Sequence, residues 1–303
     1  MKSSNLWILT EERPKRDVLF NIIKKFADDN GISFFVEQNL FIVPILNING
    51  DFSFGYKILG VHSAVIRNVF LFVVSGNSSF TDFLIFYQDN TPNSLQDIPL
   101  YAIEETKTSD HESRNTGVFQ RASKFVFIDL YYKDVKKIML YSIRIGQDKN
   151  PTHTNIFGSK CLATLGVQIL GKSLDDYAIS PFVSIDELIN FKNSMRLPPK
   201  GNIPILIRKL KNKITISGRL EKGGLLSHDP NIGALSLISA TLRALGYVGR
   251  IEIISHNLSQ NQIGRGNKFV SIANLLGISL KNIDLPAIQN DDSYWHYETQ
   301  GEK

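Results

Sequence analysis

Several residue types that build common functional sites are scarce in this chain. The single cysteine, Cys161, excludes an intrachain disulfide and a cysteine-rich zinc site. It lies in an apolar, helical stretch, which indicates a buried structural thiol rather than a nucleophile. The six histidines show no metal-ligand spacing, and the GxxxxGKS/T phosphate loop is absent. An ATP-driven translocase built on that loop is therefore excluded.

Long apolar runs are also missing. The longest candidate, residues 65–74, is interrupted by Arg67 and Asn68, and a membrane-spanning helix needs roughly 20 apolar residues. The first 17 residues carry early charges and lack the apolar core of a signal peptide. Together with the low cysteine content, this predicts a soluble, cytoplasmic protein with no membrane partner.

The composition is that of a globular protein with a mild excess of positive charge. Of the 303 residues, 43% are hydrophobic, which is enough for a sizeable core in one large domain or two smaller ones. Charged residues make up 21%, so extensive disorder is not expected. The formal net charge of +5 suits a polyanionic partner such as nucleic acid, without requiring one.

The first half of the chain is predicted to form a helix followed by strands. Apolar residues recur at three- and four-residue steps over residues 14–29, which predicts an amphipathic helix that stops at Asn30-Gly31. Strand-like runs separated by turn residues follow. They cover residues 33–36, 40–46, 54–59 and 68–74.

Two further strands are predicted at residues 82–88 and 99–107, separated by a polar, turn-forming segment. A helix near residues 117–131 and a strand over 137–145 follow. This succession predicts an α/β fold with a mixed sheet flanked by helices.

The character of the sequence changes after Gly146. We expect helices at residues 155–170, 184–195, 234–245 and 268–276, a hairpin over 203–220 that turns at Lys211-Asn212, and a strand at 250–255. We therefore predict a core over residues 1–146 and an additional α+β region over 147–303. The two could also pack as one continuous domain.

The segment Glu105-Thr106-Lys107, at the end of a predicted strand, carries the main chemical signal. Side chains alternate along a strand, so Glu105 and Lys107 lie on one face while Glu104 lies on the other. A carboxylate beside an ammonium group suits metal-assisted phosphodiester hydrolysis. The carboxylate holds a divalent ion, and the lysine orients or deprotonates the attacking water.

Hairpin geometry selects a second carboxylate. If residues 82–88 and 99–107 pair antiparallel, the start of the first strand lies beside the end of the second. Asp82 is then close to Glu105. Asp89 lies near the turn and Asp97 within it, so both are poorer candidates.

At these residues the chain resembles the PD-(D/E)XK nucleases. Their motif is an aspartate that opens one strand of a hairpin and an acidic-x-lysine triplet that closes the next, and Asp82, Glu105 and Lys107 match those positions. Thr81 stands where the family usually has proline. The resemblance covers roughly residues 14–146 and does not extend to the C-terminal half.

The resemblance implies an endonuclease that hydrolyses duplex DNA with Mg²⁺ held by Asp82 and Glu105. The chain has no phosphate loop, and the long region after the core is available to recognise a DNA sequence. Both features favour a type II restriction enzyme. One triplet per chain predicts a homodimer, because two copies are needed to cut both strands. The alternatives are a repair, resolvase or transposon-end nuclease, and a non-catalytic DNA-binding protein in which Glu105 and Lys107 form a solvated surface pair.

Two groups of residues are candidates for contacting DNA. The family often carries a polar or basic residue on the helix after the motif, where Gln120, Arg121 or Lys124 could serve. The amide- and base-rich segment 256–268 offers side chains suited to base edges; these are Asn257, Gln260, Asn261, Gln262, Arg265 and Lys268. The alternative interpretation of this segment is a solvated loop.

Overall fold

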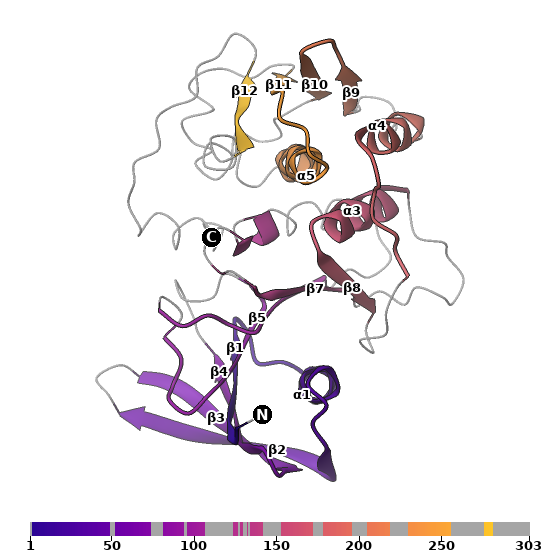
Figure 1. Cartoon of the computed structure of the whole chain (residues 1–303). Coiled ribbons are helices and arrows are strands. Elements are labelled where there is room, and N and C mark those ends of the chain that lie inside the picture. Colours follow the sequence, from indigo (N-terminus) through magenta and orange to yellow (C-terminus); the bar gives the residue numbers. More distant parts are fainter. Residues whose placement is uncertain are drawn as a thin grey trace. The chain divides into compact units, whose positions relative to one another are not determined.

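The computed structural model describes residues 2–48, 52–73, 81–93, 96–106, 124–126, 128–129, 132, 134–141, 153–171, 178–195, 205–218, 230–255 and 276–280, and Figure 1 draws these in colour. The chain divides into two compact units. The first is made of Met1–Glu105, Ile128–Ser142 and Leu170–Tyr177, and the second of Thr106–Phe127, Ile143–Ile169 and Ala178–Lys303. The predicted domain boundary after residue 146 stays a prediction.

An eight-stranded sheet dominates the N-terminal half, with the strand order β2-β3-β4-β1-β5-β6-β7-β8. β1 is parallel to β4 and antiparallel to β5, so the sheet is mixed. This sheet and its helices confirm the predicted α/β class. The strands are β1 (Ser4–Thr10), β2 (Phe34–Ile48), β3 (Phe52–Ser63), β4 (Ile66–Val73), β5 (Phe83–Gln88), β6 (Tyr101–Thr106), β7 (Lys136–Tyr141) and β8 (Val167–Gly171).

The central strand β1 is one that the sequence analysis did not predict. It lies between β4 and β5, and six of its seven residues are buried. A strand covered on both faces carries a nearly continuous apolar run instead of the polar-apolar alternation that identifies a half-exposed strand. The missed strand matters because it supplies the neighbour of β5, which opens the candidate motif.

Helix α1 (Arg16–Asp29) confirms the amphipathic helix that the sequence predicts. Its buried face packs with β1, β4 and β5 in one hydrophobic cluster, to which Leu19, Ile23 and Phe26 contribute. Burying each such side chain stabilises the fold by about 1.5–3 kcal/mol. The helix ends as predicted at Asn30, and Gly31 then takes a positive φ of 62°, which glycine adopts at little cost.

The C-terminal half contains a second, four-stranded sheet in the order β12-β11-β10-β9. β9 (Leu206–Lys209) and β10 (Lys213–Gly218) form the predicted hairpin, in which Leu210 N–H donates to Lys213 O at 2.8 Å. β10 is parallel to β11 (Arg250–Ser255), and α5 (Pro230–Ala244) connects them. β12 (Ile278–Leu280) pairs parallel with β11.

Helix α5 lies on one side of these four strands (Figure 1). Two more helices are described in this half, α3 (His153–Thr164) and α4 (Ile185–Ser194); α3 contacts α5 and α4 contacts β9. Among the described residues, no helix is both long and apolar enough to cross a membrane.

One helix prediction is partly wrong. The expected helix over residues 155–170 ends at Thr164 as α3, and residues 167–171 form strand β8. The change occurs at Gly166, whose φ of 73° is incompatible with continuing the helix. The apolar run that follows pairs with the sheet instead, since β8 lies next to β7.

Candidate active site

The hairpin of β5 and β6 is antiparallel, as the sequence predicts. Phe83 pairs with Ile103 and Ile85 with Tyr101, so the start of β5 lies beside the end of β6. A hydrogen bond of 2.7 Å from Leu100 N–H to Ile85 O closes the other end of the pair. The hairpin therefore brings the acidic residues at the two strand ends together.

Two hydrogen bonds connect Asp82 with Glu104 and Glu105 where the two strands end. Asp82 N–H donates to Glu104 Oε2 at 3.2 Å, while Glu105 N–H donates to Asp82 Oδ2 at 2.6 Å. The exposed fraction of Glu104 is 0%, whereas Asp82 and Glu105 are half-buried. Each of these bonds places a carboxylate against a backbone amide of the opposite strand.

The register refines the expectation that Asp82 lies close to Glu105. Because Phe83 pairs with Ile103, the next position places Asp82 opposite Glu104, and directly opposed residues share a face of the sheet. Asp82 contacts Glu105 through the backbone N–H of that residue. Glu104, which the sequence analysis placed on the opposite face from the site, thus lies immediately beside Asp82.

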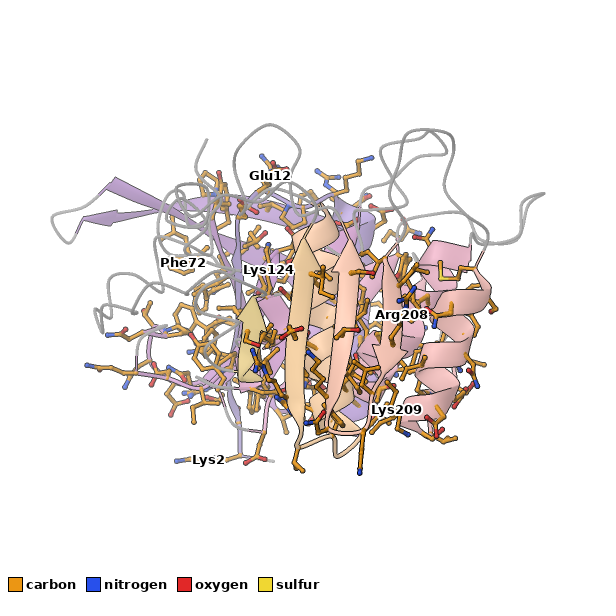
Figure 2. All side chains as sticks on the ribbon, turned by 90° about the horizontal axis from the view of Figure 1, so that it is seen from above. Lys2, Glu12, Phe72, Lys124, Arg208 and Lys209 are labelled. Atoms are coloured by element: carbon orange, nitrogen blue, oxygen red, sulfur yellow. The ribbon has the colours of Figure 1, made fainter. Side chains whose placement is uncertain are left out.

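The end of β1 brings two further carboxylates to the same edge of the first unit. Thr10 pairs with Phe83, and Glu11 N–H donates to Asp82 O at 3.4 Å. Glu11 and Glu12 are exposed, and Figure 2 labels Glu12. The sequence did not predict β1, so neither glutamate was a candidate. Only the pairing of β1 with β5 places them near Asp82.

Thr81 stands where the nucleases that the chain resembles usually have proline before the aspartate. Its side chain is buried, and its hydroxyl donates to Phe83 O at 3.0 Å. A local hydrogen bond from a threonine side chain stabilises a bend, which proline does instead by restricting φ. The substitution is therefore compatible with a fixed bend ahead of Asp82.

The carboxylates at the end of this hairpin are the type of ligand that Mg²⁺ takes in proteins. Proteins commonly hold this ion with one or two carboxylates, while water and substrate phosphates complete the shell. Asp82 Oδ2 accepts from Glu105 N–H. Among the described residues, no group of three or more His, Cys, Asp and Glu side chains is arranged to hold a metal.

The start of β6 is fixed by a polar cluster at the end of α1. Tyr101 O–H donates to Asp29 Oδ2 at 2.9 Å, and Lys136 Nζ lies 3.6 Å from the same oxygen. Burial and the Asp29 carboxylate raise the pKa of Tyr101. Burial also tends to raise the pKa of Asp29, but hydrogen bonds from Lys25 and Tyr101 and the nearby lysine charges lower it below its ordinary value. The cluster ties α1 to the strand that ends in the candidate motif.

Most other predicted site residues lie outside the described residues. These are Lys107, Gln120, Arg121, Asn257, Gln260, Asn261, Gln262, Arg265 and Lys268. Lys124 is described, and it is half-buried in a short helical segment, residues 124–126. The roles assigned to all of these residues stay predictions.

The lone cysteine is buried, as the sequence predicts. Cys161 has an exposed fraction of 0%. Burial raises the pKa of its thiol to about 12, so the thiol stays protonated at neutral pH and is a poor nucleophile.

Comparisons with protein-family models, with curated proteins and with solved structures find no match to this chain.

Proposed function

We propose that this protein is a Mg²⁺-dependent endonuclease that hydrolyses phosphodiester bonds of duplex DNA, with the role of a type II restriction enzyme. The observation that carries the proposal is the β5–β6 hairpin. It joins Asp82 to the Glu104-Glu105 pair through two hydrogen bonds, and Lys107 follows two residues later in the sequence. This combination of carboxylates and a lysine is the one that the nuclease motif requires.

Asp82 and Glu105 would hold the metal ion; although the register places Asp82 opposite Glu104, its carboxylate reaches the backbone of Glu105 at the end of the strand. Such an ion supplies an activated water and neutralises charge on the phosphate. The hydrogen bond from Glu105 N–H fixes the orientation of the Asp82 carboxylate, which limits the rearrangement that metal binding requires. Lys107 would stabilise the attacking water or the negative charge that develops on the phosphate.

Glu104 would act as a positioning residue. Its fully buried carboxylate accepts from Asp82 N–H and so fixes the backbone on which Asp82 stands.

The substrate would be cut on both strands by a homodimer. The sequence carries one candidate triplet, so two copies related by two-fold symmetry are needed to cut both strands in one encounter. The motif must contact a phosphate group, which is the same in every DNA sequence. We therefore assign recognition of the target sequence to the C-terminal half.

Purified protein incubated with phage DNA and Mg²⁺ tests this function. We expect discrete fragments in Mg²⁺ and none in EDTA. Cleavage confined to branched or mismatched DNA would favour a repair or resolvase enzyme instead. Persistent single-strand nicks would contradict the dimer, and binding without metal-dependent cleavage would identify a non-catalytic DNA-binding protein.

A further inference from the structure

The hairpin of β9 and β10 carries four basic residues within a six-residue stretch. Arg208, Lys209, Lys211 and Lys213 lie between positions 208 and 213, and the stretch contains no acidic residue. Arg208, Lys209 and Lys211 are exposed. Figure 2 shows the four-stranded sheet with Arg208 and Lys209 labelled at the edge strand β9. Residues 208–213 thus form a concentrated patch of positive charge, the basic hairpin.

The two faces of the four-stranded sheet differ in chemistry. Ile214, Ile216 and Ile251 are fully buried, and they alternate with residues that point to the other face. On that other face, Arg208 pairs with Thr215, which in turn pairs with Glu252. The apolar face packs into the interior, so the basic side chain of Arg208 belongs to the polar face.

The charges of Arg208 and Lys211 are not neutralised within the described structure. Neither side chain forms a hydrogen bond or an ion pair with a described residue. Lys209 differs, because its Nζ lies 2.8 Å from Asp186 Oδ1 on α4. Arg208 and Lys211 are therefore available to an anionic partner, whereas Lys209 already has one.

The carboxylate of Glu252, on this polar face, does not offset those two charges. Glu252 is buried and lies between two bases, with Lys213 Nζ at 2.9 Å from its Oε1 and an Arg250 nitrogen at 3.2 Å from its Oε2. One carboxylate shared by two bases leaves a net positive charge. The polar face thus carries a net positive charge even around Glu252.

We infer that the basic hairpin, with Arg208 and Lys211 as its main contacts, binds the phosphate backbone of duplex DNA independently of base sequence. Exposed, unpaired arginine and lysine side chains are the groups that contact phosphates, and such contacts position a protein on DNA without specifying sequence. The inference deepens the proposed function by naming a surface that holds the substrate, and it takes DNA as the partner from that proposal.

An acidic protein is a poorer partner for this surface. Protein interfaces depend on a few large, buried anchors, most often aromatic residues or arginine in a packed pocket. By the strand register, the described polar face includes Leu206 and Ile254 as well as Arg208, Thr215, Ser217 and Ser279, and none of these six is aromatic.

The test is the salt dependence of DNA binding by the double variant Arg208→Gln/Lys211→Gln. Binding is measured by fluorescence anisotropy on two unrelated duplexes in EDTA, so that it does not depend on metal or cleavage. We expect binding weaker by on the order of tenfold on both duplexes, and a log–log salt slope shallower by about two. The charge-conserving variant Arg208→Lys/Lys211→Arg should keep the slope of the wild type.

The matched control is Arg16→Gln/Lys24→Gln on α1. It removes the same two charges from exposed side chains that have no hydrogen bond or ion pair with a described residue. Thermal unfolding of every variant shows whether the fold is retained. An unchanged slope in the hairpin variant, an equal loss in the control, or a loss on one duplex only would overturn the inference.

The outcomes separate this inference from the proposed nuclease activity. Weaker binding by the hairpin variant without any cleavage by the wild type would support the DNA-contacting surface and reject the nuclease. Cleavage by the wild type with unchanged binding by the variant would reject the surface and support the nuclease. A wild-type protein that binds neither duplex would overturn the inference, and incubation with Mg²⁺ and phage DNA would then decide the nuclease proposal separately.

Discussion

Two antiparallel hairpins in this chain carry opposite charges in opposite settings. In β5–β6 the carboxylates of Asp82, Glu104 and Glu105 belong to buried or half-buried residues, and two of them accept hydrogen bonds from backbone amides. In β9–β10 the bases Arg208 and Lys211 are exposed. Burying a charge is costly unless specific partners compensate it, so the first hairpin suits a small, fixed ligand and the second suits an extended polyanion in solvent.

Removing the carboxylates of the first hairpin should have the strongest effect. Asp82→Asn and Glu105→Gln should each lower the cleavage rate by roughly a thousandfold or more, because a metal ion contributes several kcal/mol to stabilising the transition state. Single-turnover cleavage of phage DNA in Mg²⁺ measures this. DNA binding in EDTA should stay near the wild-type level, and full activity in either variant would reject the metal assignment.

Lys107→Ala should come next, with a loss of roughly a hundredfold in rate. A single charged group that stabilises the developing negative charge contributes about that much. The same single-turnover assay applies, with Lys107→Arg as the conservative comparison. If the Lys107→Ala variant cleaves DNA at the wild-type rate, Glu105 and Lys107 form only a surface ion pair. Lys107 would then not match the lysine of the nuclease motif.

Within the acidic hairpin, Glu104 and Glu105 should differ in their effects on stability. Glu104→Ala removes a fully buried side chain and leaves Asp82 N–H without this acceptor, which should lower the free energy of unfolding by about 1–3 kcal/mol. Glu105→Ala, at a half-buried position, should cost less. Urea denaturation of both variants measures the difference, and equal losses would contradict the pairing of Asp82 with Glu104.

A weaker effect is expected at the polar cluster that holds the start of β6. The pKa of Asp29 lies below its ordinary value in the folded protein, so its ionisation stabilises the fold above a pH of about 4, and this contribution is lost as the pH falls through the folded pKa. Asp29→Asn should therefore flatten the decline of the free energy of unfolding below that pH. Tyr101→Phe, which removes one hydrogen bond to Asp29, should give an intermediate slope. Urea denaturation at a series of pH values decides this, and a decline as steep in the Asp29→Asn variant as in the wild type would argue against it.

Local sequence pattern was sufficient to predict several elements. The amphipathic repeat and the Asn30-Gly31 stop predicted α1, and the turn at Lys211-Asn212 predicted the β9–β10 hairpin. Residue preferences and periodicity were enough in these cases because each element exposes one face and buries the other. Two strand-like runs separated by a turn-forming segment predicted the antiparallel pairing of β5 with β6, and so placed Asp82 near the end of β6.

Contacts between distant segments set the remaining features. The chain before residue 11 became the central strand β1 because β4 and β5 cover its two edges, and a fully buried strand has no alternation to detect. The register, which depends on pairing between strands, placed Glu104 rather than Glu105 opposite Asp82. Burial then distinguished the enclosed carboxylate of Glu104 from the exposed bases of the β9–β10 hairpin, because exposure is set by what packs over a side chain and not by its neighbours in the sequence.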